Sequence, residues 1–461
     1  MLFNSLQFLI FFPVMLLLYH QLSHRWQNRH LLVASYVFYA TWDWRFLFLI
    51  MGSTIVDFYC GRYIARSEDT RVRKSLLLLS IGVNGGALLF FKYFNFFVSS
   101  ATGLLEWVGL STSSHVLQIV LPVGISFYTF QTMCYTIDIY RGKLSPTDSL
   151  LDYALYISYF PQLVAGPIER ATNLLPQILN PRTVTPNACF EGTWLILWGF
   201  FKKVVVADNL CRIADWGFDN LTELNTLSGL ITIYAFAWQI YCDFSGYTDI
   251  ARGCSKLMGI ELMVNFNVPY LSRTPSEFWR RWHISLSSWF TDYVFVPLGG
   301  SRNGTWATYR NIFITMLLSG LWHGAAWTFV AWGAFHAVLL SIYRTVGSER
   351  INRLPGFVQT ILMFHLVCFG WILFRAASIT DAWLFTETLF RWSELSLPPK
   401  AYLLVLVVPL AAIELRQYLT GDQFPVFRWP APVRVVCYVT AYAAIMIIGR
   451  WDATAFIYFQ F

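Results

Sequence analysis

Long apolar stretches separated by short polar segments dominate this chain. The run from Asn311 to Ala334, for example, contains no formally charged residue. A helix needs about 20 mostly apolar residues to cross the hydrocarbon core of a bilayer. By that criterion we expect membrane spans or half-spans at residues 2–19, 31–42, 46–61, 75–97, 117–139, 150–165, 193–208, 228–250, 311–345, 357–375, 401–419 and 432–449.

Several of these stretches are irregular as membrane spans. Some are too short to cross alone, and 311–345 is long enough for one tilted helix or for two shorter ones. Gly and Pro interrupt the apolar run Leu121–Ser126, which indicates a re-entrant or broken helix covered by protein or water. We therefore predict an all-α polytopic membrane protein of about 11–12 helices or half-helices with re-entrant and interfacial segments. Residues 1–461 are expected to form a single transmembrane domain, and the first segment reads as a retained span, not a signal peptide.

Composition and charge agree with a multi-pass membrane protein. The chain is 56% hydrophobic and only 13% charged, whereas soluble domains carry about 25% charged residues. Arg25, Arg29 and the basic loop 62–74 alternate with the loop 99–115, whose one formal charge is Glu106. This alternation predicts the N-terminus outside and the 62–74 loop in the cytoplasm. This asymmetry of the loops accounts for the net charge of +7, so no nucleic acid is expected as a partner. Membrane lipids are expected partners of a multi-pass protein.

The segment 265–310 is rich in Arg and Trp and too polar to span a membrane. Within it, Thr274 is expected as a helix N-cap, Pro275 at the first helical position and Glu277 as the closing residue of a capping box.

A single helix is expected to continue beyond this start. One apolar stripe at helical spacing comprises Trp279, Trp282, Leu286 and Trp289, and a neighbouring polar face comprises Arg280, His283 and Ser287. Such a helix is typical of the membrane interface. The alternative is that its tryptophans and arginines only anchor the chain at the headgroups.

His323 lies at the middle of the uncharged run 311–334. An ionisable group at that depth is costly and by default indicates a functional site. Apolar surroundings favour the neutral imidazole, which can remove a proton from a hydroxyl as it attacks an activated acyl group. The alternative is a histidine that only hydrogen-bonds a neighbouring helix.

Cations in the segment 265–310 outnumber anions. Five arginines face only Glu277 and Asp292, and a cluster of this kind is suited to a polyanionic donor such as a nucleotide-bearing thioester. The five are Arg273, Arg280, Arg281, Arg302 and Arg310. The Gly-rich stretch Leu298–Gly304 matches no phosphate-binding fingerprint and is at least as well explained as a turn.

Asp243 and Asp249 end a long apolar run. They could relay protons or orient a histidine, or they could serve as helix caps or loop hydrogen-bonding groups. The chain has no Gly-x-Ser-x-Gly elbow, so no serine nucleophile is proposed. Its eight cysteines are scattered without a C-x-x-C pair, so neither a disulfide framework nor a metal site is predicted.

Five short stretches carry a resemblance to a known family. They are Phe127–Gln131 (FYTFQ), Ala165–Arg170 (AGPIER), Asp243–Asp249 (DFSGYTD), Glu277–Ser287 (EFWRRWHISLS) and Gly320–Gly324 (GLWHG). Together they resemble the membrane-bound O-acyltransferases, and within them the bacterial branch that acetylates exported polysaccharides.

The resemblance implies helices around a central funnel, with His323 as the catalytic histidine at its constriction and His283 in a supporting role. It also implies a cytoplasmic thioester donor, which we expect to be acetyl-CoA, used as a substrate with no bound cofactor.

The chain ends in the aromatic segment 456–461. This segment resembles a C-terminal motif of related cell-envelope acylation systems, in which a tyrosine is proposed to carry the acyl group. The resemblance would make Tyr458 an acyl-accepting nucleophile with His323 as its base. The alternative is a terminal aromatic cluster that anchors the tail at the interface.

These observations lead to one functional hypothesis. The protein is expected in the bacterial inner membrane as an O-acetyltransferase that passes acetyl groups from acetyl-CoA to an extracytoplasmic polysaccharide O-acetyltransferase. Peptidoglycan is the preferred final acceptor, with alginate or cellulose as alternatives, and a membrane transporter or a scaffold subunit remains as a non-enzymatic alternative. The expected substrate-binding residues are Arg280, Arg281, Trp282, Arg302, Trp322 and Asp243.

Overall fold

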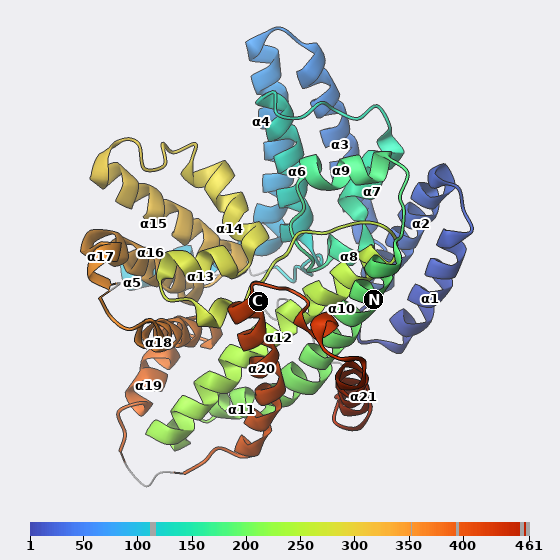
Figure 1. Ribbon diagram of the computed structural model, residues 1–461. Coiled ribbons are helices and arrows are strands. Elements are labelled where there is room, and N and C mark those ends of the chain that lie inside the picture. The colour runs from blue at the N-terminus through green and yellow to red at the C-terminus, as the bar shows by residue number, and fades with distance from the viewer. Residues whose placement is uncertain (111–116, 352, 393–395, 452–455, 458–461) are drawn as a thin grey trace. The chain divides into compact units, whose positions relative to one another are not determined.

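The computed structural model describes residues 1–110, 117–351, 353–392, 396–451 and 456–457, and within these ranges the chain is helical, with no strand (Figure 1). Five helical stretches among the same residues are long and apolar enough to cross a membrane. They are Phe46–Arg66, Thr70–Trp107, Trp327–Val346, Gly356–Arg375 and Ala401–Thr420. The expectation of an all-α polytopic membrane protein is confirmed.

Two compact units make up the chain. Unit 1 comprises Met1–Gly192 and Ala251–Met263, and unit 2 comprises Thr193–Ile250 and Val264–Phe461. Two helices, α10 (Pro186–Phe200) and α12 (Thr226–Lys256), contribute residues to both units.

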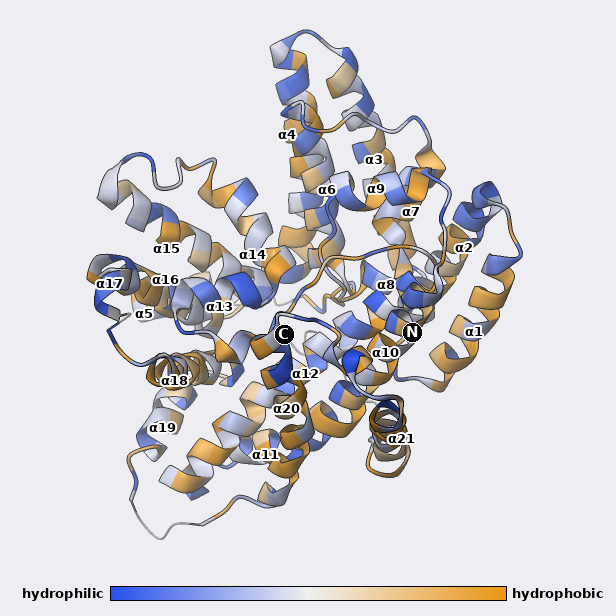
Figure 2. Cartoon of the chain, viewed as in Figure 1, coloured by the Kyte–Doolittle hydropathy of each residue, from blue (hydrophilic) through white to orange (hydrophobic). Residues whose placement is uncertain are grey.

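Unit 1 is built around three helices that pack against one another, α3, α4 and α6 (Figure 1). Side-chain caps begin several of its helices, such as Ser5, which accepts a hydrogen bond from the Phe8 N–H, and Ser149, which accepts one from the Asp152 N–H. Figure 2 shows hydrophobic residues along most of α1. The other elements of unit 1 are α1 (Leu6–His20), α2 (His24–Asp43), α3 (Phe46–Arg66), α4 (Thr70–Leu88), the π-helical turn η1 (Leu89–Tyr93), α5 (Phe94–Trp107), α6 (Ile125–Tyr140), α7 (Leu150–Ser158), α8 (Phe160–Leu163) and α9 (Ala171–Leu179).

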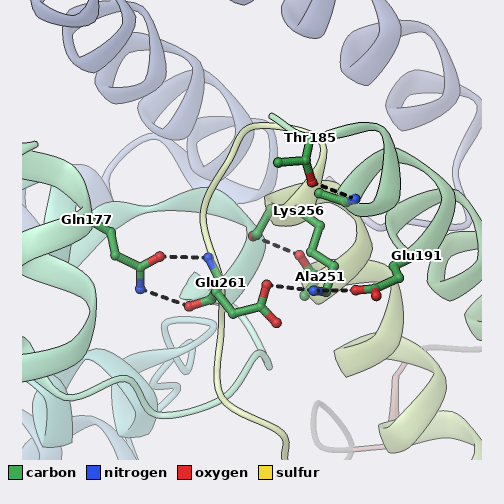
Figure 3. Close-up of polar contacts among 8 residues, drawn as sticks. Gln177, Thr185, Glu191, Ala251, Lys256 and Glu261 are labelled. Carbon is green, nitrogen blue, oxygen red and sulfur yellow. Dashed lines mark hydrogen bonds and ion pairs between the residues drawn. The ribbon is translucent and has the colours of Figure 1, made fainter. Parts of the chain in front are cut away.

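Polar contacts hold the segment that follows α12 inside unit 1 (Figure 3). Gln177 pairs with the Glu261 backbone in both directions, because its amide accepts from the Glu261 N–H at 2.8 Å and donates to the Glu261 carbonyl at 3.0 Å. Lys256 bridges Glu191 at 2.9 Å and Glu261 at 2.6 Å. These contacts fix the chain just before it enters the second part of unit 2.

A buried carboxyl group of unit 1 completes this anchoring. Glu169 accepts hydrogen bonds from the Met263 N–H at 2.6 Å and from the Asn173 amide at 2.7 Å. Burial raises the pKa of Glu169 from its usual value to about 7.

Unit 2 contains the pair of helices that carries the central histidine. The backbones of α15 and α16 approach each other closely, and glycines at the contact permit this approach. A Cβ on Gly320 would collide with the Phe329 carbonyl, and one on Gly333 with the Met316 carbonyl. Its elements are the π-helical turn η2 (Phe201–Ala207), α11 (Asp208–Asp219), η3 (Leu221–Glu223), η4 (Pro269–Leu271), α13 (Pro275–Arg281), α14 (Ile284–Phe290), η5 (Thr291–Phe295), α15 (Gly304–His323), α16 (Trp327–Val346), α17 (Ser348–Ile351), α18 (Gly356–Arg375), α19 (Ile379–Thr388), η6 (Ala401–Leu406), α20 (Val407–Thr420), η7 (Pro425–Arg428) and α21 (Ala431–Ile447).

The structure resolves two of the irregular stretches. The apolar run 311–345 forms two helices, α15 and α16, which meet at a short break after His323. The interrupted run Leu121–Ser126 is non-helical until Gly124, whose φ of 75° permits a turn that few other residues adopt, and α6 starts at Ile125.

Candidate active site

The start of α13 agrees with the capping pattern of the sequence. The Thr274 hydroxyl accepts a hydrogen bond from the Glu277 N–H at 3.1 Å. The Glu277 carboxylate reaches back to the Arg273 N–H at 2.8 Å, one residue before the N-cap. Pro275 occupies the first helical position.

The prediction of a single continuous helix beyond this start is wrong, because the helix is interrupted at His283. α13 ends at Arg281 and α14 begins at Ile284, while His283 has a left-handed φ of 43° and is fully buried, not on a polar face. Asn265 explains the break. Its carbonyl accepts from the Ile284 N–H and its side-chain oxygen from the Ser285 N–H, and such contacts compete with helical hydrogen bonding.

The same asparagine sets the protonation of His283. The Asn265 Oδ1 accepts from both the Ser285 N–H at 3.2 Å and the Ser285 hydroxyl at 2.9 Å, so this atom must be the amide oxygen. His283 Nδ1 lies 3.1 Å from that oxygen and therefore carries the proton that it donates. Burial lowers the pKa of His283 to about 3. The ring is thus neutral, with Nε2 as its acceptor nitrogen.

His323 is the last residue of α15 and is only 3% exposed. Aromatic rings enclose its imidazole: the ring centroids of Trp332 and Phe374 lie 5.0 and 5.3 Å away, both edge-on. The adjacent ring of Trp322 lies at 5.1 Å. The imidazole of His323 is therefore buried against three aromatic rings.

The two histidines lie near each other although 40 residues separate them in sequence. Their ring centroids are 6.5 Å apart, and the Trp322 ring lies 5.8 Å from His283. Three predicted site residues, His283, Trp322 and His323, are therefore brought together. A buried cluster of two imidazoles can accept and hold a proton during a reaction at an acyl group.

Asp243 lies within α12 and does not end it, so the alternative of a helix cap is wrong. Its carboxylate pairs with Lys203 at 2.7 Å and accepts a hydrogen bond from the Ile457 N–H at 2.7 Å. Lys203 also pairs with Asp208 at 2.8 Å. Asp249, likewise inside α12, pairs with Lys202 at 2.9 Å.

The contacts of Asp243 bring the C-terminal segment to the histidines. Phe456 and Ile457 are 1% and 2% exposed. The Phe456 ring lies 5.8 Å from Phe244, whose ring lies 4.7 Å from His283. Tyr458, the residue expected to carry the acyl group, lies outside the described residues.

The cationic residues are in different environments. Arg280 and Arg302 are exposed, whereas Arg281 pairs with Glu277 at 2.9 Å and also donates to the Asn267 carbonyl. Trp282 is buried, with its ring 4.8 Å from that of Trp371. Arg280 and Arg302 are therefore the accessible cations among the predicted binding residues.

Sequence reasoning missed Asn265 and Lys203. No local pattern marks Asn265, because it lies 18 residues from His283 and acts through the tertiary fold. Lys203 did leave a signal: Lys202 and Lys203 interrupt the apolar stretch 193–208, and ionisable residues at membrane depth are functional candidates. They lie in the π-helical turn η2, a geometry that is frequent at functional sites.

Comparison with known proteins gives a consistent result. The family model of membrane-bound O-acyltransferases matches residues 143–350, which include both histidines. A probable alginate O-acetylase of Pseudomonas aeruginosa is 43% identical over 396 residues, covering 85% of this chain and 75% of the relative. A probable alginate O-acetylase of Azotobacter vinelandii is 40% identical and covers 91% and 87%. A peptidoglycan O-acetyltransferase of Helicobacter pylori is 34% identical and covers 76% and 71%.

Proposed function

This chain belongs to the membrane-bound O-acyltransferase family and is a multi-pass O-acyltransferase, and on that premise we propose that it transfers acetyl groups for the O-acetylation of an exported polysaccharide. The buried pair of His323 and His283 carries the proposal. Its two buried imidazoles supply the base that removal of a proton from an alcohol requires.

Alginate, or a similar uronate polymer, is the better candidate for the final acceptor. The relatives named for alginate O-acetylation reach 43% identity, whereas the relative named for peptidoglycan O-acetylation reaches 34%. This difference in identity favours alginate, which the sequence analysis gave as an alternative acceptor, over peptidoglycan, which it preferred.

The chemistry is a transfer between a thioester and a hydroxyl. His323 removes the proton of the acceptor hydroxyl as its oxygen attacks the carbonyl carbon of acetyl-CoA. The carbon–sulfur bond then breaks, the thiolate of CoA leaves, and the imidazolium returns the proton to it. His283, held by Asn265 with Nε2 as acceptor, orients the reacting groups as a positioning residue.

Tyr458 is the proposed first acceptor of the acetyl group. It follows Ile457 directly in the sequence. The Ile457 N–H is held by Asp243, and Phe456 packs near His283 through Phe244. These contacts support the proposal that the C-terminal segment binds close to the histidines. An extracytoplasmic polysaccharide O-acetyltransferase would then take the acetyl group from the tyrosine.

Acetyl-CoA is proposed to approach from the cytoplasmic side of the bacterial inner membrane. Arg280 and Arg302 are exposed and can pair with its phosphates. Arg281 is less available, because it already pairs with Glu277.

Mass spectrometry of the C-terminal peptide tests the proposal. The purified protein in liposomes is given acetyl-CoA labelled in the acetyl group and then cleaved after Arg450, which releases residues 451–461 with Tyr458 as their one tyrosine. Label on Tyr458 is the expected result. Release of CoA without label on the peptide would contradict the relay and leave direct transfer. Absence of turnover with glycan and partner enzyme present would contradict the enzymatic function itself.

A further inference from the structure

Unit 1 contains a cavity that plays no part in the proposed chemistry. Its volume is about 230 Å³, and it lies among α3, α4 and α6. Residues of all three helices line it, among them Phe48, Gly52, Ser53, Asn84, Tyr128 and Thr129. An apolar protein cavity of roughly 150 Å³ holds a benzene molecule, so this one has room for a short stretch of hydrocarbon chain.

Two of the residues that line the cavity, Tyr128 and Thr129, carry hydroxyl groups. Tyr128 and Thr129 are 3% and 1% exposed, and within the described part of the chain neither hydroxyl has a hydrogen-bond partner. The neighbouring polar groups are already engaged, since Ser53 donates to Asn84 at 2.6 Å and Asn84 donates to Asp57 at 2.7 Å. Buried hydroxyls are normally hydrogen-bonded, so the two at this wall indicate a ligand that brings an acceptor.

The cavity lies near one end of the membrane helices. Gly52 is about 9 Å along the axis from Phe46, the first residue of α3, at the usual rise per residue. Trp42 and Trp44, just before α3, are both exposed, as tryptophans at the boundary between headgroups and hydrocarbon are. At this depth the glycerol esters of a bilayer give way to the acyl chains.

The outer rim of the cavity opens on the surface of these helices. The Phe48 side chain is 67% exposed and that of Val83 39% exposed. A Cβ on Gly52 would meet nothing within 4 Å. Both α3 and α4 belong to stretches long and apolar enough to span a membrane, so the medium that meets this rim is bilayer lipid.

We propose that this cavity is a binding site for a diacyl glycerolipid. One acyl chain fills the apolar volume, and its ester carbonyl accepts hydrogen bonds from the hydroxyls of Tyr128 and Thr129. The site is separate from the acyl-transfer chemistry and does not depend on the proposed function.

Photo-crosslinking in proteoliposomes tests the site. The full-length protein is reconstituted with phosphatidylethanolamine that carries a diazirine on one acyl chain, illuminated, and mapped by peptide mass spectrometry. We expect lipid adducts on peptides of α3 and α6 around the cavity. Gly52→Leu should lower this labelling about tenfold or more, because its side chain fills the space that the lipid needs.

Gly82→Leu is the matched control. Gly82 lies on α4, is not among the lining residues, and a Cβ there also meets nothing within 4 Å. This variant should label like the unaltered protein, and both variants should keep its elution volume and melting temperature. Equal labelling of the two leucine variants, or adducts spread evenly over all exposed helices, would overturn the proposal.

Competition between lipids tests the hydrogen bonds. An unlabelled diester lipid should displace the probe better than the corresponding diether lipid, which lacks the carbonyl. This preference should disappear in the double variant Tyr128→Phe, Thr129→Val, which keeps the shape of the wall. Equal competition by ester and ether lipids in the unaltered protein would contradict the assigned hydrogen bonds.

Discussion

Asn265 is a single residue on which the arrangement of the site depends. Its side-chain oxygen accepts from His283 and from both donors of Ser285, and these contacts end α13 and turn His283 toward His323. The sequence pattern singled out His323, because an ionisable residue in an apolar run is conspicuous, whereas His283 was singled out through the family resemblance. Neither signal could identify Asn265, because a polar residue outside regular structure carries no periodicity and its role depends on a contact made only in the folded chain.

Asn265→Ala should therefore impair catalysis as well as folding. It leaves buried donors without an acceptor, which costs about 1–3 kcal/mol per group, and it releases the His283 ring. The measurement is turnover of acetyl-CoA by protein that is still folded, together with its melting temperature. Ser285→Ala, which removes one donor and leaves the His283 contact, is the control and should keep most of the activity. Equal turnover by Asn265→Ala and the unaltered protein would contradict this role.

His283 should also make stability depend on pH. Burial lowers its pKa from 6.5 to about 3 in the folded protein, so below pH 6.5 the unfolded chain binds a proton that the folded chain does not. Stability should fall as the pH falls from 6.5 toward 3, by up to about 1.4 kcal/mol per pH unit. Melting temperatures across this range should decline less steeply for His283→Gln, which has no imidazole to protonate. The same slope in both proteins would show that the ring is not held neutral.

Among the secondary-structure elements, the apolar runs were predictable and their interruptions were not. Hydropathy located the five helical stretches that are long and apolar enough to cross a membrane. The capping box located the start of α13. The spacing of Trp279, Trp282 and Trp289 also fitted one continuous helix, yet the chain breaks at His283. Helical periodicity survives such a break when the residues on both sides still face the core. The π-helical turn η2 likewise leaves no periodic signal, although it carries the lysine that holds Asp243.

The contact of Asp243 with the C-terminal segment can be tested by removing one hydrogen-bond donor. Ile457→Pro eliminates the N–H that the Asp243 carboxylate accepts. If this contact delivers the tail, the variant should lose about tenfold or more of the acetyl label on Tyr458, because a charge-assisted hydrogen bond is worth about 1.5–3 kcal/mol. Ile457→Val keeps the N–H and most of the side chain, and should label normally. Undiminished label in the proline variant would rule out the contact as an anchor.

At the scale of the whole molecule, the charged loops predict an orientation in the membrane. The basic loop 62–74 is expected in the cytoplasm, and acetyl-CoA is proposed to reach Arg280 and Arg302 from the same compartment. The two compact units of the chain were not predicted from sequence, because two of the three boundaries between them fall inside the helices α10 and α12, where composition does not change.

Vesicles of known orientation test this arrangement, because acetyl-CoA does not cross a sealed bilayer. Inside-out membrane vesicles that contain the protein should consume added acetyl-CoA, and right-side-out vesicles should do so only after permeabilisation. Equal consumption by sealed vesicles of both orientations would contradict a cytoplasmic donor site.

The double variant Arg280→Gln, Arg302→Gln should raise KM for acetyl-CoA more than it lowers kcat, because it removes phosphate contacts and not the base.

The central claim is that His323 is the base of an acetyl transfer. The most direct measurement is release of CoA from acetyl-CoA by His323→Ala in liposomes, with elution volume and melting temperature as evidence of folding and the unaltered protein measured alongside. Removal of a general base costs about 10²–10⁴-fold in rate, so turnover should fall to that extent or below detection. A folded His323→Ala protein that turns over acetyl-CoA at the unaltered rate would contradict the claim.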